Sequence, residues 1–280
     1  MLHQRAMIVR FNSSMWEARK FDRRVTEEVE ESYKTSGRWN KSLINREALS
    51  TIATIISRAR VYHYKNTVPW AGEDALIPVE KLEEYNRKME GFKTQLAIAV
   101  EEFYYGYPQY IAEARENDET FNQNHYPPQD RIRNKFAINI TYLPVPITGD
   151  IRVDLPDGMR QEVERRLQAE QARLQKEINV NLWNRIYTTV HRMAERLSTT
   201  DRVFRDSLMG NVTDLCNMLY SLNVNQDPNL EAMRKKLEEK LASTDPGTLR
   251  DDPATRQTVA DNARKILEEI DKAGHRALEI

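Results

Sequence analysis

The strongest indication of the fold is the segment Met159–Leu197, MRQEVERRLQAEQARLQKEINVNLWNRIYTTVHRMAERL. It runs for 39 residues without a glycine or a proline, the two residues that most often interrupt a helix. Its apolar side chains recur mostly at every third or fourth position, at Val163, Leu167, Leu174, Ile178, Leu182, Ile186, Val190, Met193 and Leu197. This spacing predicts one long helix with a single apolar stripe.

The predicted helix is long for a chain of 280 residues. At ~1.5 Å per residue it would span roughly 58 Å, more than a compact domain of this size needs. We therefore expect it to pack along other helices or a partner. No set of residues along it has the pattern of an active site.

Charge is unevenly distributed along the chain. Hydrophobic residues make up 40% and charged residues 30%, and the formal net charge is −1. Residues 1–65 contain 13 Lys or Arg and 7 Asp or Glu, whereas residues 66–130 contain 5 and 13. A basic region followed by an acidic one is compatible with nucleic-acid binding, with charge pairing in an oligomer, or with helix faces that contact only water.

The sequence predicts a soluble cytoplasmic protein without membrane contact. Its single cysteine, Cys216, cannot form an intramolecular disulfide and lies in an apolar helical context, so a buried thiol is expected. The N-terminus lacks the apolar core of a signal peptide, and no run approaches the ~20 apolar residues of a membrane span.

The fold class expected from the patterning is mainly α, an elongated antiparallel bundle or stalk of long helices with a small antiparallel β ribbon. Helices are predicted at 15–34, 45–64, 78–115, 159–197, 203–222, 229–242 and 253–273. The helices at 78–115 and 159–197 have similar lengths and are expected to pair side by side, as a bundle more than a regular coiled coil. Gly106 and Pro108 are expected to end or kink the first of them.

Alternating apolar residues predict two strands, at 136–142 and 151–155, joined by a wide loop. An isolated ribbon is marginal in water, so a third strand is expected at 6–11. The chain is then divided into a helical region with these strands, 1–155, and a long helix followed by a C-terminal helical bundle, 156–280. We expect the two regions to pack as one elongated unit.

No catalytic, cofactor-binding or metal-binding residue is expected. The five histidines are scattered without metal-ligand spacing, and the nine glycines form no phosphate-binding loop. Paired glutamates lie beside the apolar stripes of helices, where charge normally faces water. An enzyme would have to use residues that only the fold brings together.

The basic N-terminal quarter contains the candidate nucleic-acid contacts. Cations can neutralise phosphates and aromatic faces can stack on bases, and Trp16, Tyr33 and Trp39 are interleaved with the cations. The candidates are Arg19, Lys20, Arg23, Arg24, Lys34, Arg38 and Lys41. Four glutamates between Glu27 and Glu31 repel phosphates, so a charge network within or between subunits is the alternative.

Part of the chain, 11–155, resembles a domain family of unknown function from tailed phages and integrative mobile elements. The order of several short pieces carries the resemblance, including the Thr67-Val68-Pro69-Trp70 corner and the Tyr-Pro pairs. Its marker residues here are Pro69, Trp70, Tyr107, Pro108, Tyr126, Pro127, Pro144 and Pro146. Each also has a purely structural interpretation, in which Pro69 and Trp70 shape a corner and the Tyr-Pro pairs end helices.

The resemblance brings no acid, base or nucleophile with it. Members of that family tend to be encoded near a MoxR-type AAA+ ATPase and a von Willebrand A-type protein, which implies a role beside such machinery in the host bacterial cytoplasm. The function expected is a non-enzymatic phage or mobile-element binding or adaptor protein that forms homo-oligomers. Its protein partner would be an AAA+ ATPase or a host defence factor. The alternative is a nucleic-acid-binding accessory factor in phage recombination or replication.

Overall fold

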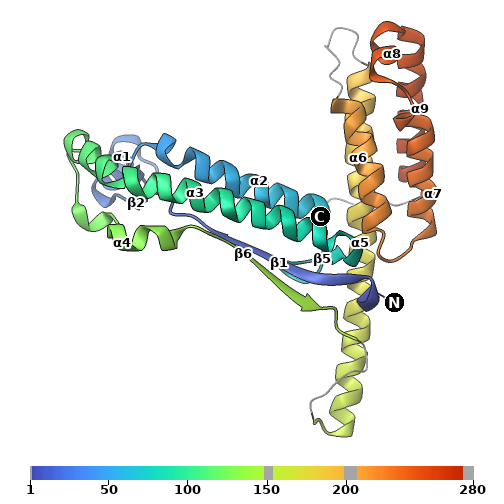
Figure 1. Ribbon diagram of the computed structural model, residues 1–280, viewed down its shortest axis with the longest axis horizontal. Helices are drawn as coiled ribbons and strands as arrows, with labels where there is room; N and C mark the ends of the chain where they lie inside the picture. The colour runs from blue at the N-terminus through green and yellow to red at the C-terminus, as the bar shows by residue number, and fades with distance from the viewer. Residues whose placement is uncertain (1, 148–153, 199–206, 274–280) are drawn as a thin grey trace. The chain divides into compact units, whose positions relative to one another are not determined.

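The computed structural model describes residues 2–147, 154–198 and 207–273 (Figure 1). Within these residues the protein is mainly helical, with one four-stranded and one two-stranded antiparallel sheet, which confirms the expectation of a mainly α protein with a small amount of antiparallel β structure. The chain forms two compact units: unit 1 combines 1–10, 64–83 and 141–280, and unit 2 combines 11–63 and 84–140. Unit 1 therefore takes residues from both sides of the boundary expected at 155/156.

The elements fall into three groups. Unit 1 contains η1 Leu2–Gln4, β4 Val68–Pro69, β5 Asp74–Pro78, α5 Asp157–Ser198, α6 Ser207–Leu222, α7 Pro228–Leu237, the π-helical η5 Glu238–Ala242, α8 Pro246–Asp251 and α9 Pro253–Lys272. Unit 2 contains β2 Arg19–Phe21, α1 Arg23–Tyr33, β3 Asn40–Ser42, η2 Arg46–Leu49, η3 Gln123–His125, α4 Gln129–Ile132 and η4 Arg133–Lys135. The elements that run from one unit into the other are β1 Ala6–Ser14, α2 Ser50–Asn66, α3 Val79–Asn117 and β6 Ala137–Pro144.

The long helix predicted at 159–197 is α5, and it organises the core of unit 1. Its stripe is buried from Leu174 to Leu197, in a hydrophobic cluster with residues of α6, α7 and α9. The helices that pack along α5 are α9 and α6 (Figure 1). The expected pairing with the helix at 78–115 is not confirmed, because α6 and α9 cover the buried face and most of α3 belongs to unit 2.

The four-stranded sheet has the order β4-β5-β1-β6. Strand β1 pairs with β5 in an antiparallel register from Ala6 opposite Pro78 to Arg10 opposite Asp74. The expected strands at 6–11 and 136–142 are thus confirmed as neighbours, β1 and β6. Of the strand expected at 151–155, residues 151–153 lie outside the described residues, and 154–155 form no strand.

The prediction of a helix at 15–34 was wrong for the first third of that range. Residues up to Ser14 extend β1, and β2 follows a bend at Ala18, whose φ of 50° is left-handed. The helix α1 begins only at Arg23, because Asp22 accepts a hydrogen bond from the backbone N of Val25 at 3.2 Å and so caps it.

Of the two outcomes expected at Pro108, an end or a kink of the helix, the first does not occur. The helix continues to Asn117 with Pro108 inside it. A proline removes the donor that would bond the carbonyl four residues earlier, and here that carbonyl belongs to Tyr104. The side chain of Gln129 donates to the Tyr104 oxygen at 3.3 Å. A residue from α4 thus replaces the missing backbone donor.

The C-terminal helices follow the predicted pattern with local differences. Residues 207–222 form α6, whereas 203–206 lie outside the described residues. The predicted helix at 229–242 corresponds to α7 and its π-helical continuation η5. The expected loop at 243–247 is shorter, because Asp245 accepts hydrogen bonds from the backbone N of Gly247 and of Thr248 and starts α8 at Pro246.

Candidate functional site

The apolar stripe of α5 is covered along only part of its length. Leu174 and the later members of the stripe are at most 3% exposed. In contrast, Met159 is 56% exposed, Leu167 is 36% exposed, and Val163 between them is partly exposed. We call residues 157–170 of α5 the open segment. An apolar row that continues a buried one marks a candidate binding surface.

The covered part begins where the chain after β6 meets α5. The side chain of Gln171 donates to the Pro146 carbonyl at 3.0 Å, and Val145 is buried in the unit 1 cluster with Leu174. From this point the helix has α6, α9 and β4 as neighbours within its own unit. The boundary of the open segment therefore coincides with the start of this packing and with the seven-residue gap of the stripe between Leu167 and Leu174, where Glu170 and Gln171 stand.

Charged residues flank the stripe on the open segment and pair along the helix. Glu162 binds Arg166 at 2.6 Å and also contacts Arg165. These pairs are solvent-exposed and of the i,i+3 or i,i+4 kind, which contribute little to stability. They can exchange partners at small free-energy cost when another charged surface approaches.

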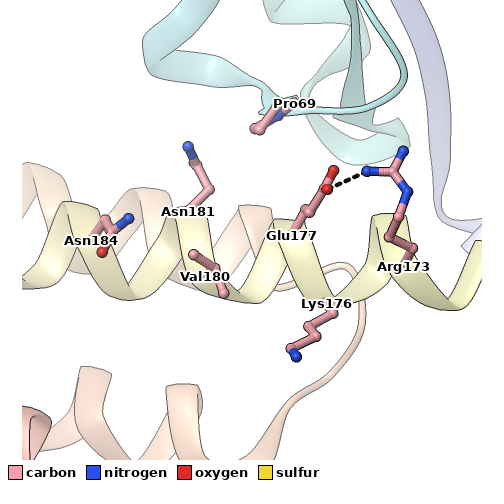
Figure 2. Close-up of a pocket in the computed structure, with 7 residues that line it drawn as sticks. All are labelled: Pro69, Arg173, Lys176, Glu177, Val180, Asn181 and Asn184. Atoms are coloured by element: carbon pink, nitrogen blue, oxygen red, sulfur yellow. Dashed lines mark hydrogen bonds and ion pairs between the residues drawn. The ribbon is translucent and has the colours of Figure 1, made fainter. Parts of the chain in front are cut away.

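A groove of about 520 Å³ lies between α5 and β4, both within unit 1. Figure 2 shows Glu177 and Asn181 directed towards Pro69, with Lys176 on the opposite side of the helix. Two cations line the groove, Arg173 and Lys176, and Arg173 is already paired with Glu170 and Glu177. Mutual neutralisation of these charges leaves the groove without a net anion-binding character.

The seven predicted nucleic-acid contacts lie on β2, α1, β3 and the segment between α1 and β3. Six of them, Arg19, Lys20, Arg23, Arg24, Lys34 and Arg38, are exposed. Arg23 pairs with Glu27 at 2.7 Å, and the Arg38 guanidinium lies 4.8 Å from the centre of the Phe21 ring. The structure thus gathers these cations on neighbouring elements of unit 2.

Exposed aromatic side chains accompany these cations. Phe21 on β2, Tyr33 on α1 and Trp39 before β3 are 37%, 76% and 50% exposed. On α1 the apolar residues Val25, Val29 and Tyr33 recur at every fourth position, yet Thr26 is the helix residue that is buried. The apolar face of α1 is therefore only partly covered by the described residues.

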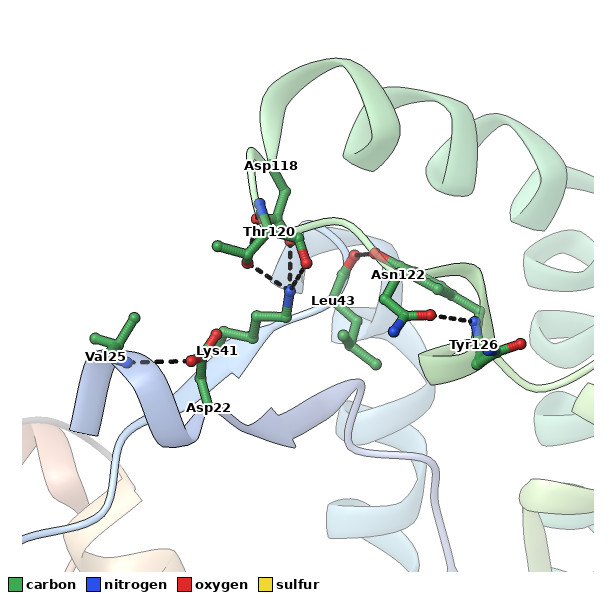
Figure 3. A network of polar contacts seen from close by, with 9 residues as sticks. Asp22, Val25, Lys41, Leu43, Asp118, Thr120, Asn122 and Tyr126 are labelled. Carbon is green, nitrogen blue, oxygen red and sulfur yellow. Dashed lines mark hydrogen bonds and ion pairs between the residues drawn. The ribbon is translucent and has the colours of Figure 1, made fainter. Parts of the chain in front are cut away.

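Lys41 does not belong with the other candidates. Its ammonium donates to Asp118 at 2.9 Å and to the Thr120 carbonyl and hydroxyl at 2.7 and 2.6 Å (Figure 3). Burial alone would raise the pKa of Asp118, but hydrogen bonds from Thr120 and Lys41 lower it. Lys41 therefore fastens β3 to the turn after α3 and is not available to a phosphate.

The marker residues of the family resemblance have structural contacts. Trp70 is buried in the unit 1 cluster. In unit 2 the Tyr107 hydroxyl donates to the Pro127 carbonyl at 2.9 Å, and the Tyr126 hydroxyl donates to the Leu43 carbonyl at 2.8 Å (Figure 3). Of the remaining markers, Pro146 supplies the carbonyl that the Gln171 side chain binds. The other three prolines are exposed: Pro69 lies in β4, Pro108 in α3 and Pro144 in β6.

Burial shifts the pKa of three titratable groups, of which the sequence singled out only Cys216, as an expected buried thiol. Burial lowers the pKa of His63 to about 4 and raises the pKa of Cys216 to about 11. Burial also lowers the pKa of Arg185, whose guanidinium donates to the Thr67 carbonyl at 2.8 Å and joins α5 to the start of β4. Each has a packing role, and they lie on different elements.

The described residues contain neither a metal-binding cluster nor a membrane-spanning helix. Among residues 2–147, 154–198 and 207–273, no cluster of three or more His, Cys, Asp or Glu is arranged to hold a metal ion. Across the same described ranges, every helix is too short or too polar to cross a membrane. No family model, curated protein or solved structure matches this chain.

Proposed function

We propose that this protein is a non-enzymatic binding or adaptor protein that assembles with copies of itself. The observation that carries the proposal is the change of burial along one stripe: Leu174 is 3% exposed, and Leu167, two turns earlier, is 36% exposed. A helical ridge with apolar residues on both parts of its length, but covered along only one of them, favours a second helix on the uncovered part.

The open segment has the features of a helix-docking surface. Met159, Val163 and Leu167 follow one another at four-residue intervals, so their side chains lie on one side of three successive turns. Charged residues border them, as at the rim of a protein interface. Burial of one such apolar side chain contributes about 1.5–3 kcal/mol.

Light scattering after size-exclusion chromatography tests the proposal with the full chain. Wild-type protein at micromolar concentration is expected to have a mass above 32.8 kDa, the mass of one chain. Leu167→Glu is expected to shift it towards the monomer, because a carboxylate on the stripe must be desolvated on association. Ile98→Glu, at a 58% exposed position of α3, is the matched control and should leave the mass unchanged. A wild-type monomer at all concentrations contradicts the proposal.

The protein partner proposed is an AAA+ ATPase or a host defence factor, in the cytoplasm of a bacterial host of a phage or mobile element. Its support is the ordered set of residues from Thr67 to Val153 that resembles the phage family described above. Affinity capture of tagged wild-type protein from infected cells, beside tagged Leu167→Glu, tests it. Recovery of neither class of protein with the wild type contradicts this part of the proposal.

A second candidate function is nucleic-acid binding by unit 2. The observation that favours it is the exposure of Phe21, Tyr33 and Trp39 beside six exposed cations on β2, α1 and the segment before β3. Single strands bind to such surfaces by stacking of bases on aromatic rings and by neutralisation of phosphates. The glutamates of α1 oppose this, since Glu27 already occupies Arg23.

An electrophoretic shift assay on single- and double-stranded DNA distinguishes this candidate. Wild-type protein should bind at ~50 mM salt and lose affinity steeply as salt rises. The triple variant Arg19→Ala, Arg23→Ala, Arg24→Ala should lose binding, whereas Arg46→Ala with Arg58→Ala, two exposed cations elsewhere in unit 2, should retain it. No shift at ~50 mM salt removes this candidate, since phosphate contacts are strongest at low ionic strength.

A further inference from the structure

We infer that the open segment pairs with the same segment of a second copy in antiparallel orientation, about a two-fold axis at Val163. This inference rests on the proposed self-assembly and specifies its geometry. Two observations within unit 1 carry it: the position at which α6 and α9 begin to cover α5, and the arrangement of charges around the stripe.

Coverage of α5 excludes parallel pairing along the stripe. In a parallel pair, the partner's helix would continue over the face of Leu174, Ile178 and Leu182, and that face is already occupied within the hydrophobic cluster of unit 1. In an antiparallel pair centred on Val163, residue 174 of the partner lies level with position 152, beyond the start of α5 at Asp157. The covered part of each copy then lies past the end of the other helix.

The apolar residues match in this register. A two-fold axis at Val163 places Met159 opposite Leu167 of the second copy, and Val163 opposite its own equivalent. Leu167 in turn faces the second copy's Met159. The three residues of the stripe therefore form three contiguous apolar layers, and closed two-fold symmetry uses the same surface on both chains.

The flanking charges match as well. At about 100° per residue, Glu162 and Arg166 lie on one flank of Val163, and Arg160 and Glu164 lie on the other. Antiparallel two-fold pairing brings like flanks together, so that Glu162 approaches Arg166 of the second copy. On the other flank, Arg160 approaches Glu164. Each flank thus carries two acid–base contacts between the copies and one contact between equivalent glutamates, so that attraction outweighs repulsion and the segment is complementary to itself.

Charge-reversed variants of the full chain test the pairing. Glu162→Arg with Glu164→Arg makes both flanks basic, and Arg160→Glu with Arg166→Glu makes both acidic. Each variant alone should dissociate at least about tenfold more readily than wild type, a change of about 1.4 kcal/mol. An equimolar mixture should restore association as a heterodimer. Glu268→Arg on α9, an exposed position, is the control for the substitution itself.

Engineered cysteines determine the orientation. In the antiparallel register, Met159→Cys in one chain and Leu167→Cys in the other lie opposite, so a mixture should form a disulfide-linked dimer under mild oxidation. Met159→Cys alone should not, because its two copies are separated by eight residues, about 12 Å, beyond the roughly 4–7 Å that a disulfide allows between Cα atoms. Wild type, whose Cys216 is buried, is the oxidation control.

The outcomes separate the two proposals. If wild-type protein associates and Leu167→Glu dissociates it, but Met159→Cys links to itself, then self-assembly stands and the antiparallel register is wrong. The same conclusion follows if the charge-reversed variants do not associate when mixed, provided that circular dichroism shows both to be folded. A wild-type monomer overturns both proposals.

Discussion

The hydroxyl of Tyr85 lies 2.7 Å from Nδ1 of His63, inside unit 2. The imidazole also stacks on Phe11, with ring centroids 5.3 Å apart, and is 2% exposed. A charged imidazolium is poorly solvated in this aromatic environment. The pKa of His63 is accordingly lowered by burial, from about 6.5 to about 4.

The burial of His63 predicts that lowering the pH reduces the free energy of unfolding before the carboxylates become protonated. The unfolded chain binds a proton at His63 below pH 6.5, whereas the folded chain does so only near pH 4. Stability from this group is therefore complete above pH 6.5 and is lost as the pH falls towards 4, by about 3 kcal/mol in all. Urea unfolding at a series of pH values measures it. In His63→Gln, which keeps an acceptor for Tyr85, this part of the pH dependence should disappear. An identical pH dependence in both proteins would contradict the assignment.

Removal of the Lys41 ammonium should destabilise unit 2. In Lys41→Met the aliphatic stem remains, but Asp118 and Thr120 lose the donor they share. We expect a loss of about 1–3 kcal/mol in the free energy of unfolding, since a partly buried carboxylate is left without its cation. Lys20→Met, at the exposed position that pairs with Lys41 across β2 and β3, is the matched control and should change stability by less than about 0.5 kcal/mol.

Two leucines of the same stripe should respond differently to truncation. Leu182→Ala removes a side chain with 0% exposure and should cost about 2–5 kcal/mol, because it leaves a cavity in the unit 1 cluster. Leu167→Ala removes one that is 36% exposed and should leave the unfolding free energy of the isolated chain almost unchanged. Denaturant titration at low protein concentration measures both. An equal loss of unfolding free energy in the two variants would show that the open segment is covered within the chain.

The thiol of Cys216 should be unreactive in the folded protein. Burial raises its pKa to about 11, so little thiolate is present at neutral pH, and the residue is 1% exposed. A thiol-specific reagent at pH 8 should label native protein slowly and urea-unfolded protein quickly. Rapid labelling of native protein would contradict this placement in α6.

Hydrophobic periodicity predicted the long helices well. The predicted ranges 78–115, 159–197 and 253–273 correspond to α3, α5 and α9 within two residues at each end. A long amphipathic stripe can be recognised from the residues of one segment, whereas a three-residue strand cannot. Both β2, Arg-Lys-Phe, and β3, Asn-Lys-Ser, lack apolar alternation and depend on pairing across twenty residues.

What the sequence did not predict depends on contacts between distant residues. Nothing near Pro108 indicates that Gln129 supplies a donor to Tyr104. The stripe of α5 was visible in full, but its coverage from Leu174 onward comes from α6 and α9. Likewise, the sequence grouped Lys41 with the other cations, and only the fold shows that Asp118 holds it.

The division of the chain into interleaved stretches fixes an order of events during synthesis. Unit 2 is complete once residue 140 has emerged from the ribosome, whereas the strand residues Ala6 and Ile8 belong to a cluster that extends to Ile270. Ala6 and Ile8 therefore lack most of their final neighbours until some 260 further residues have been translated. The nascent chain begins at the N-terminus but first becomes compact in its middle.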